Sequence, residues 1–263
     1  MLTRLLIRVG LTTPEQRAWA WYDWANSVYF TTVITAVFPS FYATYAAAGL
    51  EPAQATARFG LVTTLSVAVV AILSPVLGAL ADYSGIKKKL LAIFMAIGVL
   101  ACAAMAFITE GNIALASALF FIGNIGVSGS VVFYDSLLPH VAKPEETDRV
   151  SAAGYAMGYV SGGVLLLINL AWILQPEVFG FGSTVSAIRA SFVSVALWWA
   201  VFSLPLFRKV REPPVNPAEA GHYKEPYTDS VVSGFSRIGV IAVSFQRLAR
   251  IRLFQQARRE SRP

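Results

Sequence analysis

Long apolar stretches separated by short polar ones dominate the sequence. A helix needs about 20 mainly apolar residues to cross a bilayer core of roughly 30 Å. Six stretches reach this length, at residues 20–46, 58–81, 89–109, 112–138, 151–174 and 187–207. The connections between them are short, which favours antiparallel neighbours. The pattern therefore predicts an all-α membrane protein built as a six-transmembrane helical bundle.

Polarity divides the chain into three predicted parts. Residues 1–17 form a cytoplasmic N-terminal segment, residues 18–207 the transmembrane bundle, and residues 208–263 a cytoplasmic linker and tail. The tail begins with a polar, proline-rich stretch, which is typical of a solvated linker. Its last part fits two alternatives equally, an amphipathic helix on the membrane surface or a frayed end. The helix would separate apolar Ile241, Phe245 and Leu248 from basic Arg247 and Arg250.

Composition agrees with a membrane protein. Of the 263 residues, 56% are hydrophobic and 14% charged, whereas about a quarter of the residues of an ordinary soluble domain are charged. The mean hydropathy is +0.60. With Cys102 as the single cysteine, an intramolecular disulfide and a metal site made of cysteines are both excluded. The first predicted partner is therefore the lipid bilayer.

Lysine and arginine are concentrated on one side of the predicted bundle. Of the 21 basic residues, all except Arg58 and Arg189 fall in the two terminal segments or in the loops after the second and fourth spans. Because cytoplasmic segments carry the excess of basic residues, both termini are predicted to be cytoplasmic. The net charge of +6 then reflects topology, and its expected partner is anionic lipid headgroups rather than nucleic acid.

Two polar side chains, Asp23 and Asn26, lie early in the first predicted span. An ionisable group inside a membrane is costly, so it usually faces protein or water and marks a pathway. Two interpretations of Asp23 stay equally open. It is a carboxylate near a helix end, held by local hydrogen bonds or by Arg17, or it is a cavity carboxylate that binds a proton or a substrate ammonium group. Asn26 is three residues further on, so both side chains are expected to face one cavity.

Aromatic residues surround this pair, namely Trp19, Trp21, Tyr22, Trp24, Tyr29 and Phe30. Tryptophan and tyrosine are enriched where a membrane meets water, so most of these rings are predicted to form an interfacial belt. Tyr22 and Tyr29 are the expected exceptions, because their hydroxyl groups are able to reach a solute.

The loop after the second span reads "GALADYSGIKKKLL", from Gly78 to Leu91. Gly78 permits close approach of helices, and Gly85 permits a tight turn. Asp82 is expected to end a helix at the cytoplasmic surface, where a carboxylate can latch onto a neighbouring helix start or a cation. Lys87 and the two lysines after it keep the loop in the cytoplasm.

This arrangement of glycine, three residues, aspartate, two residues, glycine and a basic run resembles the signature loop of the major facilitator superfamily. That signature lies between the second and third helices of its fold, and the loop here has the same place. Tyr83 and Ile86 stand where the signature usually has arginines. The resemblance implies that Asp82, Gly85 and Lys87 belong to a gating loop.

Three further stretches look like the vacuole-effluxer-like branch of that superfamily, the autophagy-related amino-acid effluxers. They are "WYDWANSVYFTTVITAVFPSFY", "FYDSLLPH" and "RVSAAGYAMGYVSGGVLLLINL". Proteins of the superfamily have about twelve helices in two halves, and residues 18–207 resemble the amino-terminal half. Fungal members of the branch are associated with export of amino acids from the vacuole. The resemblance implies transport of small polar solutes, with amino acids as one candidate. The expected location is a bacterial plasma (inner) membrane.

The fourth and fifth spans add the remaining candidates. Asn124 is a pathway candidate, with a hydrogen bond between helices as the alternative. Asp135 is expected near the cytoplasmic face in a network with Asp82 and either Lys87 or Arg149, with a weak surface ion pair as the alternative. Small residues repeat along the fifth span at Gly154, Gly158 and Gly162, with Gly163 beside the last. This spacing predicts a smooth groove for helix packing.

Enzyme motifs for zinc, nucleophile or phosphate-loop chemistry do not occur in the sequence, so we expect no enzymatic activity, no cofactor and no metal. The predicted function is secondary active transport by alternating access, driven by an ion or solute gradient. The alternative is a truncated or split half-transporter that binds a partner, a second six-helix half or a second copy, without transporting.

Overall fold

The computed structural model describes residues 6–7 and 10–212, excluding the side chains of residues 80–84. The described residues form helices and turns and include no strand, which confirms the predicted all-α membrane bundle. The side chain of Asp82 and the predicted tail helix lie outside the described residues. The boundaries expected for the terminal segments therefore stay predictions.

The first helix, α2 (Pro14–Val28), begins earlier than the apolar pattern suggested. Thr13 precedes it as the N-cap, and its hydroxyl accepts the N–H of Gln16 at 3.1 Å. The side-chain oxygen of Gln16 accepts the N–H of Thr13 in return. This reciprocal capping satisfies two backbone donors at the helix start, and Pro14 has no donor to satisfy. The helix therefore starts in the polar "TTPEQ" stretch.

Beyond Val28 the first span stays helical but changes its winding. It continues as the π-helix η1 (Tyr29–Val37), the short helix α3 (Phe38–Phe41) and the π-helix η2 (Tyr42–Ala46). The hydroxyl of Thr35 donates to the carbonyl of Phe30, five residues earlier, as the wider turn allows. A π-helix turns less per residue than an α-helix, so side chains after Tyr29 leave the faces that a regular helix would give them.

The other five predicted spans coincide with long helices. They are α4 (Pro52–Ser84), α5 (Lys87–Ala104) with the 3₁₀ turn η3 (Met105–Phe107), α6 (Ile113–Ser136), α8 (Thr147–Leu174) and α9 (Thr184–Lys209). Within the described residues, these five are the helices long and apolar enough to cross a membrane, and no single helix of the first span reaches that length. Short elements connect them, namely α7 (Leu138–Val141), η4 (Pro144–Glu146) and η5 (Pro176–Phe179).

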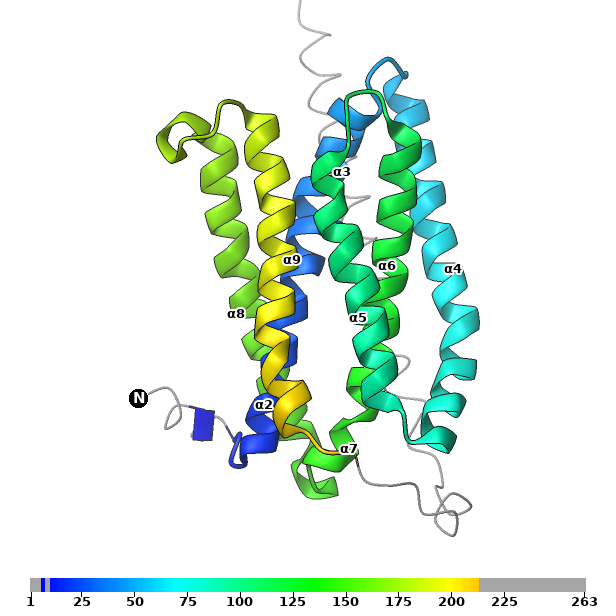
Figure 1. The fold of residues 1–263 in the computed structure, drawn as a ribbon, viewed down its shortest axis with the longest axis vertical. Helices are drawn as coiled ribbons and strands as arrows, with labels where there is room; N and C mark the ends of the chain where they lie inside the picture. The colour runs from blue at the N-terminus through cyan, green and yellow to red at the C-terminus, as the bar shows by residue number, and fades with distance from the viewer. Residues whose placement is uncertain (1–5, 8–9, 213–263) are drawn as a thin grey trace, which may run out of the picture. The chain divides into compact units, whose positions relative to one another are not determined.

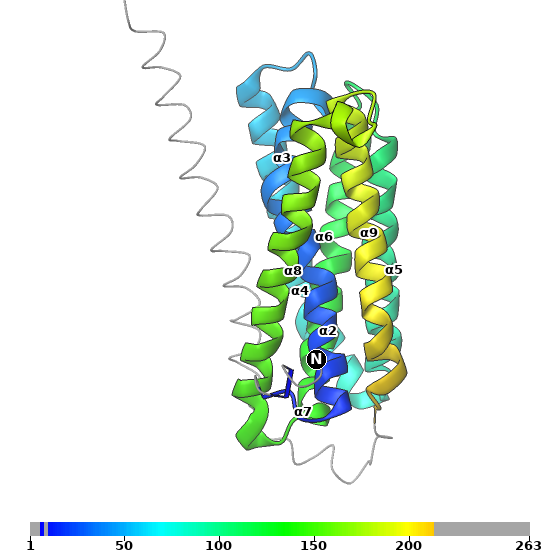
Figure 2. The ribbon, with the colours of Figure 1, turned by 90° about the vertical axis from the view of Figure 1, so that its left-hand side faces the viewer.

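The long helices form two packed groups (Figure 1). In one group α2 lies against α8 and α9, and in the other α6 lies against α4 and α5. Contacts between α5 and α9 join the groups, as the turned view in Figure 2 also shows. The first span is thereby surrounded by other helices, which places its polar residues inside the bundle.

Apolar side chains cover the outward faces of α4 and α8. Ile72 and Val76 of α4 are 73% and 64% exposed, and Tyr159 and Leu167 of α8 are 78% and 70% exposed. Exposed faces of this size would be unfavourable in water, but they suit a hydrocarbon environment. Together with the five candidate spans, they identify an integral membrane protein.

Candidate functional site

Asp23 lies deep in the bundle where three helices meet. Its side chain is 1% exposed. Asp23 lies about 13 Å along the helix axis from Pro14, where α2 begins, at 1.5 Å per residue. A Cβ added to Gly154 of α8 would be 3.0 Å from Asp23 Oδ2 and 3.4 Å from the hydroxyl of Tyr134 in α6. The absence of a side chain at Gly154 thus leaves room for the carboxylate and the phenol to approach each other. Arg17, by contrast, donates to the carbonyls of Leu11 and Thr12.

Aromatic rings enclose this junction. Tyr134 stacks on Trp19 with 4.3 Å between ring centroids, and Tyr22 lies 4.9 Å from Tyr134. The indole N–H of Trp19 donates to the carbonyl of Tyr134 at 3.1 Å. The belt interpretation is therefore wrong for Trp19, which is 1% exposed. Its ring and its polar tip are both used inside the protein, and such packing cannot be read from composition.

The other predicted pathway residues of the first span are fully buried. Within the described residues, neither amide atom of Asn26 has a hydrogen-bond partner. The hydroxyl of Tyr29 packs against Gly123 of α6, and its ring lies 5.7 Å from that of Trp199 in α9. The polar neighbours of the Tyr22 hydroxyl are Ser130 and Trp199. Tyr22 and Tyr29 therefore face α6 and α9, whereas Asp23 faces α8.

Asn124 of α6 is 8% exposed and directly follows Gly123. Each of the five predicted pathway residues is thus at most 8% exposed. A solute can reach these side chains only if the helices around them move apart. This requirement is compatible with a pathway that opens in one conformation and closes in another.

Three glycines of α8 form a track along the first span. Gly154 meets Asp23 and Gly158 meets Ser27, both in α2, and Gly162 meets Thr31 in η1. Each side of the contact contributes every fourth residue. At the last position the Thr31 hydroxyl also donates to the Gly162 carbonyl at 3.2 Å. Gly163 has no atom within 4 Å of an added Cβ and lies outside the track. Close approach of the two backbones depends on the three glycines.

A carboxylate that follows α9 holds the start of α5. Glu212 accepts the backbone N–H of Lys87 at 2.7 Å and that of Lys88 at 3.2 Å. The side chain of Lys88 donates to the carbonyls of Phe207 and Val210, at 3.0 and 2.6 Å, where α9 ends. A negative group at a helix start and a positive group at a helix end are both favourable with the helix dipole. The pair fastens α5 to α9.

Lys87 extends the same contacts toward α6. Its ammonium group lies 3.4 Å from the carbonyl of Ser136, at the end of α6, and 3.4 Å from Nε2 of His140 in α7. Asp135 precedes Ser136 and is half-buried. The loop that the sequence identified is therefore a junction between three long helices.

The remaining loop residues lie on α4. Gly78 is buried within the helix, and Asp82 belongs to its last turn. Gly85 ends α4 in the left-handed conformation, with φ of 62°, which glycine adopts without steric cost. The chain then turns directly into α5 and brings Lys87 to its position.

Arg149 forms an ion pair with Glu146 at 2.9 Å, and its side chain is 50% exposed. Exposed pairs of this kind contribute less than about 1 kcal/mol. The expected network of Asp135 and Asp82 with Lys87 or Arg149 stays a prediction. Glu146 also accepts the side-chain N–H of Gln16 at 3.2 Å, which ties the start of α8 to the start of α2.

Glu212, Glu146 and Gln16 were not among the residues selected from the sequence. One signal was present for Glu212, because it is a carboxylate on the predicted cytoplasmic side and close to the end of the last span. Its partner helix was not readable, since Lys87 is more than a hundred residues away in the chain.

Known proteins resemble the chain over most of its length. The family described as "Vacuole effluxer Atg22 like" matches residues 12–147 and 142–258. An uncharacterised MFS-type transporter, YxiO, of Bacillus subtilis (strain 168) is 36% identical over 247 residues, which is 92% of this chain and 54% of that protein. Autophagy-related protein 22 of Coccidioides immitis (strain RS) is 24% identical over 258 residues, 77% of this chain and 42% of that protein.

The chain spans about half the length of the curated relatives it matches. No solved structure gives a significant match to it.

Proposed function

The chain belongs to the Atg22-like vacuole effluxer family of the major facilitator superfamily, and on this premise we propose that it forms the amino-terminal six-helix half of a secondary active transporter. The proposed substrates are small polar solutes, and amino acids are the first class to test. The names of the relatives support membrane transport. The identity of the solute and that of the coupled ion are parts of the proposal. A bacterial inner membrane with both termini in the cytoplasm is the proposed location.

The junction around Asp23 carries the proposal. A carboxylate that is 1% exposed and lies beside Gly154 and the Tyr134 hydroxyl is poised to take up a proton or an ammonium group. The stacked rings of Trp19 and Tyr134 would add attraction for a cation over their faces. Asn26, with no partner for its amide within the described residues, would supply a hydrogen bond to the solute.

Burial of the pathway residues supports the proposed alternating access. The pathway residues are covered by α6, α8 and α9, so a solute enters only when helices separate. The contacts of Glu212, Lys87 and Lys88 hold the ends of α5, α6 and α9 together, and we assign them to stabilising one of the two states. We assign the same role to Asp82 and Gly85, which belong to the signature-like loop between α4 and α5.

The test is flux in proteoliposomes. The full chain and Asp23→Asn are reconstituted, a proton gradient is imposed, and uptake and efflux of a panel of labelled amino acids are measured. Asp148→Asn is the matched control, because Asp148 is an exposed carboxylate in the first turn of α8. We expect gradient-dependent flux that Asp23→Asn abolishes and Asp148→Asn retains. Equal flux in wild type and Asp23→Asn would reject the role of the carboxylate.

A second candidate function is a half-transporter that needs a partner. Two observations favour it. The chain covers only about half of the length of its relatives, and the outward faces of α4 and α8 are apolar and exposed. The chain would then show flux only when co-reconstituted with the carboxy-terminal half of a relative such as the Bacillus subtilis transporter. Flux by the chain alone, in its monomeric form, would rule this function out, and flux confined to a dimer would identify a second copy as the partner.

A further inference from the structure

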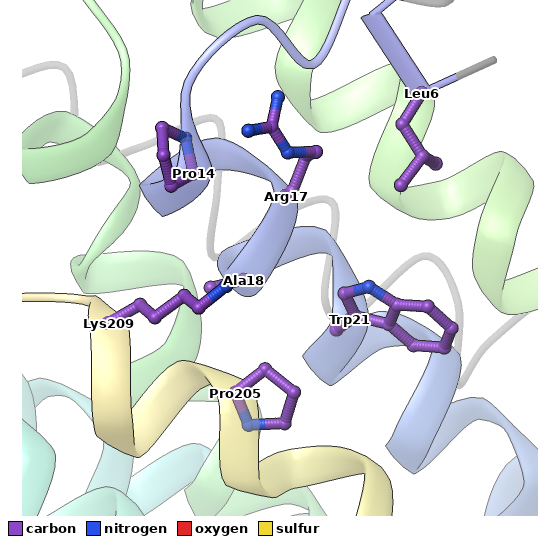
Figure 3. Close-up of a pocket in the computed structure, with 7 residues that line it drawn as sticks. All are labelled: Leu6, Pro14, Arg17, Ala18, Trp21, Pro205 and Lys209. Atoms are coloured by element: carbon purple, nitrogen blue, oxygen red, sulfur yellow. The ribbon is translucent and has the colours of Figure 1, made fainter. Parts of the chain in front are cut away.

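A recess with two positive side chains lies between the start of α2 and the end of α9. It encloses about 180 Å³, and its walls include Arg17, Ala18 and Trp21 of α2 with Pro205 and Lys209 of α9. Figure 3 shows Lys209 extending from α9 toward Ala18, with Trp21 and Pro205 on neighbouring turns of the two helices. All residues that line the recess are either basic or apolar, so its charge is positive.

The positive groups are available to an anion. Arg17 uses one guanidinium nitrogen, Nη1, to donate to the carbonyls of Leu11 and Thr12 at 3.1 and 2.9 Å. This leaves further N–H groups of its planar fork, which matches the geometry of phosphate oxygens. Within the described part of the chain, neither Arg17 nor Lys209 takes part in an ion pair, and Lys209 is exposed.

Aromatic rings beside the recess indicate its depth in the membrane. Trp21 stacks on Phe202 with 5.6 Å between centroids, and Trp24 stacks on Trp198 with 5.9 Å. The indole N–H of Trp198 donates to the carbonyl of Trp24. Trp21 is half-buried, and tryptophans are enriched at the level of the lipid headgroups. The start of α2 and the end of α9 are also on the side that the basic residues assign to the cytoplasm, so we place the recess at the level of the lipid phosphates.

An exposed apolar row runs along α9 on the face next to the recess. Leu197, Val201 and Leu204 are 61%, 55% and 44% exposed and follow each other at helical spacing. Leu204 directly precedes Pro205, so this row lies on the face of α9 next to the one that lines the recess. A soluble anion has no use for such a row, whereas the acyl chains of a lipid can lie along it while the headgroup occupies the recess.

We propose that this recess is a binding site for an anionic phospholipid. Arg17 and Lys209 contact the phosphate, Trp21 packs against the glycerol region, and the acyl chains follow the exposed face of α9. Basic pockets between membrane helices are known to hold anionic headgroups. The site is separate from the Asp23 junction, so it stands or falls independently of the proposed transport function.

The experiment measures lipid binding by the full chain. Protein in a neutral detergent is titrated with phosphatidylglycerol or with phosphatidylcholine, and bound lipid is counted by native mass spectrometry. We expect preferential retention of phosphatidylglycerol. The double substitution Arg17→Gln with Lys209→Gln weakens it about thirtyfold, the scale set by two basic residues near a lipid surface.

A matched control loses the same charge elsewhere. Lys89→Gln with Lys143→Gln removes two exposed basic groups that do not line the recess, and we expect phosphatidylglycerol binding to stay within twofold of wild type. Lys209→Gln alone is the second variant, because Arg17 also holds the turn before α2 and its loss could disturb folding. Lys209→Gln should show a partial loss of binding.

Three results would overturn the proposal. Equal losses in the recess and control variants would show attraction by general surface charge. If both Lys209→Gln and the double variant bind phosphatidylglycerol as wild type does, the recess is not a lipid-binding site. Competition by inorganic phosphate as effective as that by phosphatidylglycerol would identify a site for soluble anions instead.

Discussion

The carboxylate of Glu212 accepts the backbone N–H of Lys87 at 2.7 Å, across 125 residues of sequence. Lys87 is the first residue of α5, so its N–H has no partner within its own helix. Glu212 satisfies this donor and also that of Lys88, and it lies at the positive end of the α5 dipole. The contact joins the loop after the second span to the segment that leaves the sixth.

Glu212→Ala should lower the stability of the protein. The substitution removes two charge-assisted hydrogen bonds at the start of α5, so we expect a loss of about 1 to 2 kcal/mol. Thermal unfolding in detergent, followed by tryptophan fluorescence, measures the change. Glu145→Ala is the control, since Glu145 is exposed and accepts no hydrogen bond among the described residues. An equal midpoint for the two variants would contradict the assignment of Glu212.

Lys88→Met should be more damaging than Lys89→Met. The side chain of Lys88 donates to two carbonyls at the end of α9, whereas Lys89 is exposed. Loss of Lys88 leaves those carbonyls without this donor, and we expect about 1 kcal/mol of destabilisation. Urea titration of both variants in the same detergent gives the comparison. Indistinguishable midpoints would mean that water replaces the lysine without cost.

Gly158→Ala should push α2 and α8 apart, and Gly163→Ala should not. A Cβ at Gly158 would collide with the Ser27 side chain, whereas one at Gly163 meets no atom within 4 Å. Overpacking of this kind costs about 1 to 3 kcal/mol. Disulfide cross-linking of a cysteine pair placed at the α2–α8 contact reports the separation, with thermal stability as a second reading. A stable and normally cross-linked Gly158→Ala protein would argue against tight packing there.

Asn26→Leu should leave stability unchanged or raise it. Both Asn26 and Asn169 are fully buried, but within the described residues the Asn26 amide has no hydrogen bond, whereas Asn169 Oδ1 accepts the Ser194 hydroxyl at 3.0 Å. Asn169→Leu should therefore lose about 0.6 kcal/mol, the mean for such bonds in membranes. Proteoliposome flux should show the reverse order, with Asn26→Leu the more harmful. A strongly destabilised Asn26→Leu protein would show that the amide has a structural partner.

Sequence patterns were sufficient for the helical architecture. Each long apolar stretch is helical, five as long helices and the first as four consecutive helical elements, because a segment in lipid must satisfy its backbone groups internally. Helix starts were less accurate. The signals for Thr13 and Pro14, and for Pro52 at the start of α4, lie in polar stretches that an apolar pattern passes over. The π-helix η1 had no readable signal, since its winding depends on the helices packed around it.

The sequence by itself determined which segments enter the membrane, that the repeat of Gly154, Gly158 and Gly162 allows close packing, and where the signature-like loop lies, because these properties are local and depend on length, spacing and composition. Only the tertiary structure decided how equivalent residues differ. It directs Lys88 to α9 and leaves Lys89 exposed, and it buries Trp19 against Tyr134 while Trp21 stays half-buried beside the basic recess. The physical reason is that the partner of each side chain lies on a helix far away in the chain, and its distance and direction exist only once the helices have packed.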